Sequence, residues 1–462
     1  MNLATYLTKF KAIWSKYNTL VVLIGLVVVF WAYTVFLASN LQTDIVPDEP
    51  LHFNVAKNFA KTWGIPDPEP TTRSMGTYIK QNPYLAYWIY GRVLNVLETF
   101  NPTAGGWQQL IFLRIANSLF SIGTLIFVFL ISKELITNKW WQLLPVFALS
   151  NTMMFVLLSS GVNYDNLVNM FCAGGIYYLI RVLNHKDLIT NSLAWMIFIS
   201  LGAWVKETVL PLALAMAVVW VIFLIKQRPT INLKALRNFK TIFLISTFVL
   251  LVVANFSIYG VNLIKHQSLT PSCKDYYSDE FCRNTPLAIR RAELALPEKP
   301  NLLQAFKRGY PEPLRYAFDT WIPSMLMKTF GIMGGQKSYY PINLSYFKFL
   351  FYWLIALIIR YFRGTSFKIY SLAGVVGFYT ITLFIKNFDI ELAYGFLQVA
   401  LQGRYIFPVI GIIYSLFSYV IFKVPNKLIR YTTLIAAITL FVYSGPIRFL
   451  LYADSVFSDW FI

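Results

Sequence analysis

The sequence predicts an all-α polytopic membrane protein with about eleven transmembrane helices. Of its 462 residues, 57% are hydrophobic, 18% are aromatic and only 13% are charged, whereas roughly 25% of a soluble domain is charged. Intrinsic disorder is excluded because it requires low hydrophobicity and many charges. Apolar runs of about 16–24 residues recur along the chain, and about 20 residues are enough to cross a bilayer as a helix.

Eleven apolar runs account for the predicted spans. The first extends from about Thr19 to Ser39 and is too long for the apolar core of a signal peptide, so we expect it to be retained. The other runs begin near Leu110, Trp141, Leu167, Leu193, Pro211, Thr241, Leu344, Ile369, Tyr405 and Tyr431. No internal repeat or linker divides the chain, which predicts a single membrane domain over residues 1–462.

The positive charges predict the orientation. A net charge of +19 is compatible with nucleic-acid binding, but in a membrane protein Lys and Arg gather in the cytoplasmic connections. Every second connection is short and basic: Lys133–Lys139, Arg181–Lys186, Lys226–Lys240, Arg360–Lys368 and Lys423–Arg430. We therefore expect a cytoplasmic N-terminus, extracytoplasmic long connections at 40–107 and 265–343, and no nucleic-acid partner.

Two helices are expected to lie on the membrane surface in the first outer connection. The segment from Pro83 to Phe100 is apolar enough to cross, but a crossing there would invert every later basic connection. Apolar residues from Leu51 to Trp63 also recur at helical spacing. Both segments therefore suit amphipathic helices in the interface. In the second long connection, Cys273 and Cys282 suit a disulfide on the oxidising side of the membrane, with a zinc site as the alternative.

Acidic residues are scarce, and their tightest group follows the first span in the sequence PDEPLHF. Asp48 suits a helix N-cap, with Glu49 and Pro50 in the first turn. The same two carboxylates could instead take a proton from a substrate hydroxyl. Partial shielding by protein and lipid would raise the pKa of such a carboxyl and make it a better general base.

Three further charged residues are predicted at the outer ends of spans. Asp165, in VNYDNL, suits either a helix start or a second carboxylate in the same cavity. Lys206, in VKETVLP, could extend to the interface or bind a phosphate. Arg404, in QGRYIFP, opposes both the positive-inside trend and the helix dipole. Its partner is expected to be a carboxylate or a phosphate bound through its planar donor fork.

Together these residues predict an outer-face site for a phosphate-bearing substrate, most naturally a membrane lipid. The sequence contains no P-loop, GxGxxG, HExxH or GxSxG motif. NTPase, dehydrogenase, zinc-protease and hydrolase functions therefore lack support. A transporter or flippase is expected to place charges at mid-membrane, whereas these residues lie at span ends. A polysaccharide polymerase would share the site but use an oligosaccharide donor on pyrophosphate.

The motif order resembles the GT-C superfamily of integral-membrane glycosyltransferases. PDEPLHF, NPYLAYW, RIANSLFSIGTL, VNYDNL, VKETVLPL and GRYIFP occur in that order. The chain looks most like a bacterial membrane-protein family with PDEPxHF and QGRYxxP motifs, and protein O-mannosyltransferases and lipid A aminoarabinose transferases are more distant relatives. It departs from many relatives at Asn82-Pro83, where they have His-Pro-Pro.

The resemblance implies an inverting enzyme of the bacterial inner membrane with a polyprenyl-phosphate sugar donor. The acceptor would be a cell-surface glycan, a lipid-linked glycan or a protein. Asp48 matches the base, with Glu49 as second candidate; Asp165 matches the second acidic residue, and Lys206 and Arg404 match the phosphate-binding cations. His52, Tyr84 and Tyr405 lie in the same motifs as supporting residues. Some relatives bind a divalent metal, but Glu49 and His52 are too few ligands to predict one.

Overall fold

The computed structural model describes residues 3–67, 82–229, 236–284, 286–295, 299–308, 312–333, 338–339, 344–394, 401–456 and 458–462. Parts of the two long connections that are expected to be extracytoplasmic, including 68–81 and 340–343, lie outside these residues. Most of the described chain is helical. Two short antiparallel strands, β1 (Ile332–Met333) and β2 (Ser338–Tyr339), pair Ile332 with Tyr339.

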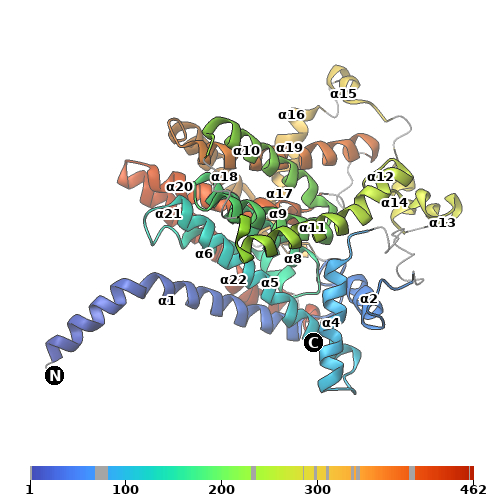
Figure 1. Ribbon diagram of the computed structural model, residues 1–462, viewed down its shortest axis with the longest axis horizontal. Helices are drawn as coiled ribbons and strands as arrows, with labels where there is room; N and C mark the ends of the chain where they lie inside the picture. Colours follow the sequence, from blue (N-terminus) through green and yellow to red (C-terminus); the bar gives the residue numbers. More distant parts are fainter. Residues whose placement is uncertain are drawn as a thin grey trace.

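The helices of the first half include both the expected surface helices and the first spans (Figure 1). They are α1 (Leu3–Asn40), α2 (Glu49–Ala60), α4 (Leu85–Phe100), α5 (Gly106–Leu135), α6 (Leu144–Ser150), α7 (Met153–Ser159), α8 (Asp165–Leu183), α9 (Leu188–Val205), the 3-10 turn η2 (Glu207–Val209), α10 (Leu210–Gln227), α11 (Phe239–Asn255), the π-helical turn η4 (Phe256–Gly260) and α12 (Val261–His266).

The second half begins with short helices and ends with long ones. They are η5 (Cys273–Asp275), α13 (Asp279–Arg283), α14 (Pro286–Leu294), α15 (Leu302–Arg308), α16 (Pro313–Arg315), the π-helical turn η6 (Tyr316–Trp321), α17 (Ile322–Phe330), α18 (Leu344–Tyr361), α19 (Phe367–Tyr394), η8 (Gly403–Ile406), α20 (Phe407–Lys423), α21 (Lys427–Ser444), α22 (Pro446–Val456) and η9 (Ser458–Trp460). In this half Cys273 and Cys282 are disulfide-bonded.

Ten helical stretches among the described residues are long and apolar enough to cross a membrane. The predicted fold class, an all-α polytopic membrane protein, is confirmed. The run expected to cross near Trp141 does not form one continuous helix. Instead it forms α6 and α7, which are separated at Asn151 and Thr152.

The broken pair α6–α7 still carries the chain from one end of the bundle to the other. At one end, Glu134 near the end of α5 binds Lys186, which follows α8. At the other end, Asp165 at the start of α8 lies beside Arg404, which also contacts Asp48. The chain must therefore return between α5 and α8. The break is tolerated because Asn151 and Thr152 hydrogen-bond to the carbonyls of Phe147 and Ala148.

Helix α8 occupies the centre of the bundle and packs against α5, α9, α10 and α20. Small residues allow its close approach to α9. A Cβ at Gly174 would lie 2.4 Å from the Phe198 ring, and one at Gly175 would lie 2.7 Å from the Ile199 side chain. Such small-residue contacts are typical of helix pairs in membranes. These contacts fix the position of α8 relative to α9, and with it that of Asp165, the first residue of α8.

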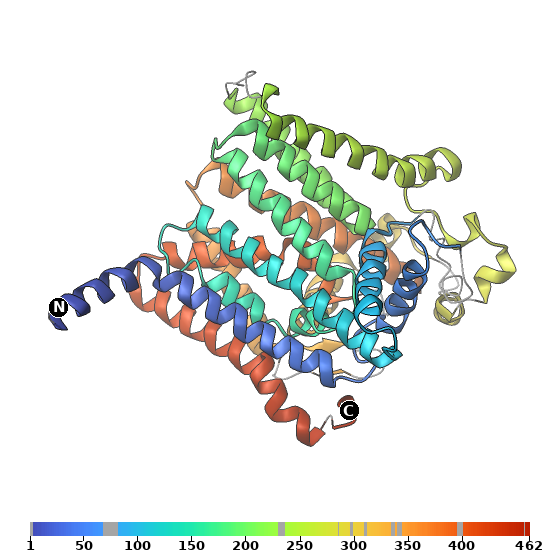
Figure 2. The ribbon, with the colours of Figure 1, turned by 60° about the horizontal axis from the view of Figure 1, so that its bottom comes forward.

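Helices α2 and α4 pack against each other at one end of the bundle. A Cβ at Gly91 of α4 would lie 2.7 Å from the backbone of Phe59 in α2, and Arg92 donates hydrogen bonds to the carbonyls of Phe59 and Thr62. Figure 2 shows the long helices side by side, with α2, α4, α13 and α14 gathered at the same end. Asp48, which immediately precedes α2, is thereby held at this end.

Candidate active site

Four charged side chains from four separate segments meet in one chain of contacts. The Arg404 Nη2 atom lies 2.6 Å from Asp48 Oδ2, and its Nε lies 3.8 Å from Asp165 Oδ2. The other Asp165 oxygen lies 2.6 Å from the Lys206 Nζ. Two carboxylates and two cations give a net charge of zero, so their burial is compensated.

Asp48 is the accessible member of this chain. About half of its side chain is exposed, whereas Asp165, Lys206 and Arg404 are buried. Asp48 is the N-cap residue of α2 with a left-handed backbone (φ 62°), but its side chain makes no capping hydrogen bond. Aspartate tolerates this region better than most residues. The carboxylate is therefore directed to Arg404 rather than used to cap the helix.

Aromatic rings surround the buried cation of Lys206. This residue has an extended backbone between α9 and η2. Its Nζ lies 4.5 Å from the centre of the Tyr164 ring and 5.2 Å from that of Tyr405. Burial lowers the pKa of Lys206, but the charge and hydrogen bond of Asp165 together with Tyr405 outweigh it, so the pKa lies above its ordinary value and the amine stays charged. Tyr405 is itself fixed from α19, because Tyr379 donates to its carbonyl at 3.0 Å.

Glu49 has a different environment from its neighbour Asp48. It is fully buried and accepts two hydrogen bonds from Arg114, at 2.8 and 2.5 Å, and one from the Val162 backbone at 2.9 Å. Arg114 also donates to the carbonyls of Ala38 and Leu41. This pair joins α1, α2 and α5 to the segment before α8. The geometry argues against Glu49 as a base, because its oxygens are occupied and inaccessible.

His52 is buried beneath the charged chain. Its Nδ1 lies 2.9 Å from the Tyr87 hydroxyl, and its ring meets the edge of Tyr164 at 4.6 Å. Burial lowers its pKa to about 4, so the ring is neutral at neutral pH. Tyr84 lies further out, stacked on Phe59 and edge-on to Trp204. Tyr84 thus packs between α2 and α9.

The expected rise in the pKa of Asp48 is wrong. Burial does raise its pKa, but Arg404, His52 and Lys206 lower it by more, so the pKa lies below the usual value. Shielding from solvent acts in the expected direction, and the guanidinium of Arg404 reverses its effect. In this arrangement Asp48 is a weak base that is paired with Arg404.

Arg114 and the aromatic rings at Tyr87 and Tyr164 were not singled out from the sequence. Arg114 lies in the RIANSLF motif at the predicted outer end of a span. It therefore departs from the positive-inside trend in the same way as Arg404. That signal was therefore available. Tyr87 and Tyr164 gave no such signal, because aromatic residues are common throughout this chain.

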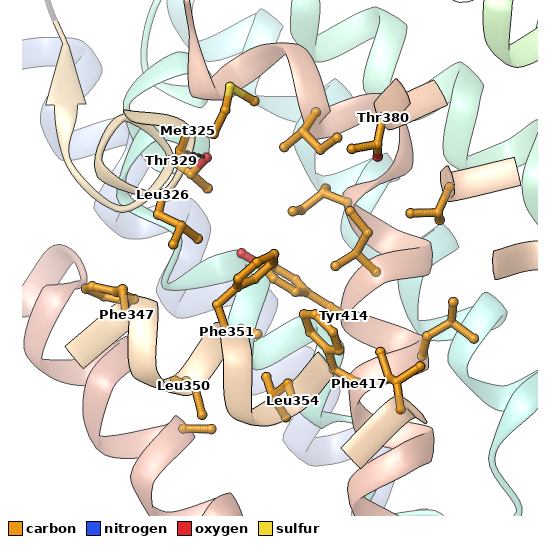
Figure 3. Close-up of a pocket in the computed structure, with 18 of the residues that line it drawn as sticks. Met325, Leu326, Thr329, Phe347, Leu350, Phe351, Leu354, Thr380, Tyr414 and Phe417 are labelled. Atoms are coloured by element: carbon orange, nitrogen blue, oxygen red, sulfur yellow. Dashed lines mark hydrogen bonds between the residues drawn. The ribbon is translucent and has the colours of Figure 1, made fainter. Parts of the chain in front are cut away.

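The charged chain adjoins a large apolar cavity. The cavity has a volume of about 450 Å³ and lies between α17, α18, α19 and α20. Figure 3 shows Met325, Leu326 and Thr329 on one side, Thr380 across the cavity from them, and Phe351 below. Ile406, two residues after Arg404, is also part of the wall. The cavity therefore reaches the turn that carries the phosphate-binding candidate.

A metal site does not fit the residues of this region. Within the described parts of the chain, no three His, Cys, Asp or Glu side chains gather closely enough to hold a metal ion. Glu49 and His52, which were considered together in the sequence, are instead engaged by Arg114 and Tyr87.

Comparisons with known proteins agree with this architecture. Residues 98–259 match the family model for dolichyl-phosphate-mannose-protein mannosyltransferase. The apo structure of ArnT from Cupriavidus metallidurans aligns with a TM-score of 0.50 and 13% identity, over 91% of this chain and 62% of that chain. The chain therefore shares its fold with ArnT, which agrees with the resemblance to the GT-C superfamily. No curated protein matches the sequence.

Two other solved structures align with the chain at lower scores. ArnT from Cupriavidus metallidurans bound to undecaprenyl phosphate gives a TM-score of 0.48, with 13% identity and coverage of 91% and 62%. The apo oligosaccharyltransferase of Archaeoglobus fulgidus gives 0.48, with 13% identity and coverage of 91% and 55%. The chain thus spans less than two thirds of these proteins.

Proposed function

We propose that the chain is an inverting glycosyltransferase that uses a polyprenyl-phosphate sugar as donor. The acceptor is the hydroxyl of a glycan, a lipid-linked glycan or a protein on the extracytoplasmic side of the bacterial inner membrane. The observation that carries the proposal is the chain of Asp48, Arg404, Asp165 and Lys206 beside an apolar cavity. The mannosyltransferase family match and the binding of undecaprenyl phosphate by ArnT support it.

The donor phosphate binds Arg404, with Lys206 close behind it. Arginine suits a phosphate because its planar fork donates two parallel hydrogen bonds. Arg404 already contacts Asp48 and Asp165, so an arriving phosphate competes with one of them. Asp48 is the half-exposed partner and the easier one to displace. The isoprenoid tail then follows Ile406 into the apolar cavity.

Displacement by the phosphate activates Asp48. Its low pKa depends on the charge and hydrogen bond of Arg404, after burial has acted in the opposite direction. Once Arg404 is neutralised by phosphate, burial dominates and the pKa of Asp48 rises. A carboxylate with a higher pKa is a stronger general base. Donor binding therefore prepares the base before the acceptor reacts.

The transfer forms one bond and breaks one at the anomeric carbon, and it moves one proton. The acceptor oxygen gives its proton to Asp48 and attacks the anomeric carbon from the face opposite the phosphate. The bond from that carbon to the phosphate oxygen breaks, and polyprenyl phosphate leaves with the electron pair. Arg404 and Lys206 stabilise the charge that grows on the phosphate. Loss of one such preorganised group typically slows a reaction by about 10²–10³.

Asp165 has a supporting role in this scheme. It is buried between Lys206 and Arg404 and contacts both cations. Its negative charge keeps the two cations together before the phosphate arrives. Because it is inaccessible, it orients the cations instead of taking the acceptor proton.

The test uses protein purified in detergent and radiolabelled undecaprenyl-phosphate sugars, with candidate acceptors added separately. We expect the label to move to one acceptor and free polyprenyl phosphate to accumulate. Asp48→Asn should abolish this transfer and still fold. Retained transfer in that variant would refute the base assignment. Movement of intact donor across vesicles without cleavage would instead indicate a flippase, and transfer of a whole oligosaccharide from a pyrophosphate would indicate a polymerase.

A further inference from the structure

A buried lysine outside the charged chain contacts the segment that carries Arg404. Lys328, in α17, is 1% exposed, and its Nζ donates a hydrogen bond to the Leu401 carbonyl at 2.5 Å. The Leu401 carbonyl lies three residues before Arg404. Burial of an ammonium group is costly, and burial lowers the pKa of Lys328 to about 8. An apolar residue would be easier to bury at this position, so the lysine calls for a specific role.

The backbone of α17 also touches the same segment directly. A Cβ placed on Gly403 would lie 2.5 Å from the Lys328 carbonyl carbon and 2.5 Å from the Thr329 nitrogen. Only glycine permits so close an approach between backbones. Gly403, which precedes Arg404, therefore packs directly against the backbone of Lys328.

A third contact holds the other side of Arg404. Tyr379, in α19, donates to the Tyr405 carbonyl at 3.0 Å. Arg404 thus lies between one hydrogen bond at Leu401 and another at Tyr405, with the α17 backbone against Gly403. The next residue of α17, Thr329, lines the apolar cavity (Figure 3), as does Ile406. One anchoring arrangement therefore sets the position of the guanidinium relative to the cavity wall.

We propose that Lys328 is a positioning residue for the donor: it fastens the Leu401–Arg404 segment to α17 so that Arg404 meets the phosphate while the isoprenoid tail occupies the cavity. This inference rests on the proposed function. It assigns Lys328 no contact with the reacting atoms. Its loss should weaken donor use, because small displacements of a substrate-orienting group reduce productive binding.

The experiment compares Lys328→Met with Lys328→Arg and with a matched control, Lys368→Met. Lys368 also donates from Nζ to a backbone carbonyl, that of Glu134 at 2.8 Å, but at the opposite end of the bundle. We expect Lys328→Met to raise the KM for undecaprenyl-phosphate sugar by about 10- to 100-fold with a smaller change in acceptor KM. Lys328→Arg should restore most donor use, and Lys368→Met should leave donor KM unchanged.

Binding of undecaprenyl phosphate alone, measured by native mass spectrometry in detergent, provides a readout independent of turnover. Lys328→Met should weaken this binding and Lys368→Met should not. An unchanged donor KM in folded Lys328→Met, or an equal loss in Lys368→Met, would overturn the inference. If Lys328→Met does not fold, Gly403→Ala tests the same anchor and should also raise donor KM. Failure of wild-type protein to use any donor would contradict the proposed function instead.

Discussion

The adjacent carboxylates of Asp48 and Glu49 should respond in opposite ways to loss of charge. Glu49→Gln removes the partner of fully buried Arg114. Breaking a buried ion pair on one side costs about 3–5 kcal/mol of stability. Asp48→Asn removes a half-exposed partner and leaves the buried Arg404 paired with Asp165, so its cost in stability should be smaller than that of Glu49→Gln. The effect of Asp48→Asn on the transfer rate should be much larger than its effect on stability, because general base catalysis contributes about 10²–10⁴ in rate.

Cys172 provides the stability assay. The chain has three cysteines, two of which form the disulfide, and Cys172 is buried in α8. A thiol-reactive dye should therefore label the protein only as it unfolds. Glu49→Gln should be labelled at a clearly lower temperature than wild type, and Asp48→Asn close to wild type but inactive. Wild-type stability in Glu49→Gln, or transfer by Asp48→Asn, would refute the division of roles.

Three further outcomes are expected. His52 stays unprotonated in the fold to a pH of about 4, whereas the unfolded chain protonates it near 6.5; stability should fall by about 3 kcal/mol between pH 6.5 and 4, and His52→Gln should flatten this slope in thermal unfolding. Arg404→Gln should shift the acid limb of the residual kcat/KM profile to higher pH, since Arg404 lowers the pKa of Asp48. An acid limb at the wild-type pH would contradict the claim that Arg404 controls the pKa of Asp48. A Cβ at Gly377 or Gly374 meets nothing within 4 Å, but only Gly377 is among the cavity-lining residues. Gly377→Leu should therefore raise the KM of an undecaprenyl donor by about tenfold and spare a short-chain donor, and equal effects in Gly374→Leu would contradict this use of the cavity.

Much of the fold could be predicted because membrane constraints act along the chain. Apolar length and the alternation of basic connections suffice to predict spans such as α5 and α20, since every backbone polar group in lipid must be satisfied within its own helix. The break at Asn151 was not predicted, because the same constraint leads one to expect an unbroken helix in any long apolar run. In a segment buried within the bundle, neighbouring groups can satisfy a broken helix, and hydropathy does not register them.

The members of the charged chain were also accessible to sequence reasoning. Asp48, Lys206 and Arg404 are charges at span ends where charges are unexpected, and the structure brings them together with Asp165. Their pairing was less accessible, because it depends on how separate helices pack. The distinction between Asp48 and Glu49 depends on Arg114, which is 65 residues from Glu49. Lys328 lies in a long connection whose sequence gives no indication of its contact with Leu401.

The exchange of partners at Arg404 is the central claim of this mechanism, and a cryo-electron microscopy structure with undecaprenyl phosphate bound tests it most directly. We expect the phosphate within hydrogen-bond distance of the Arg404 guanidinium, the tail beside Ile406, and the Asp48 carboxylate released. A phosphate bound elsewhere, with the 2.6 Å contact between Asp48 and Arg404 intact, would contradict the claim.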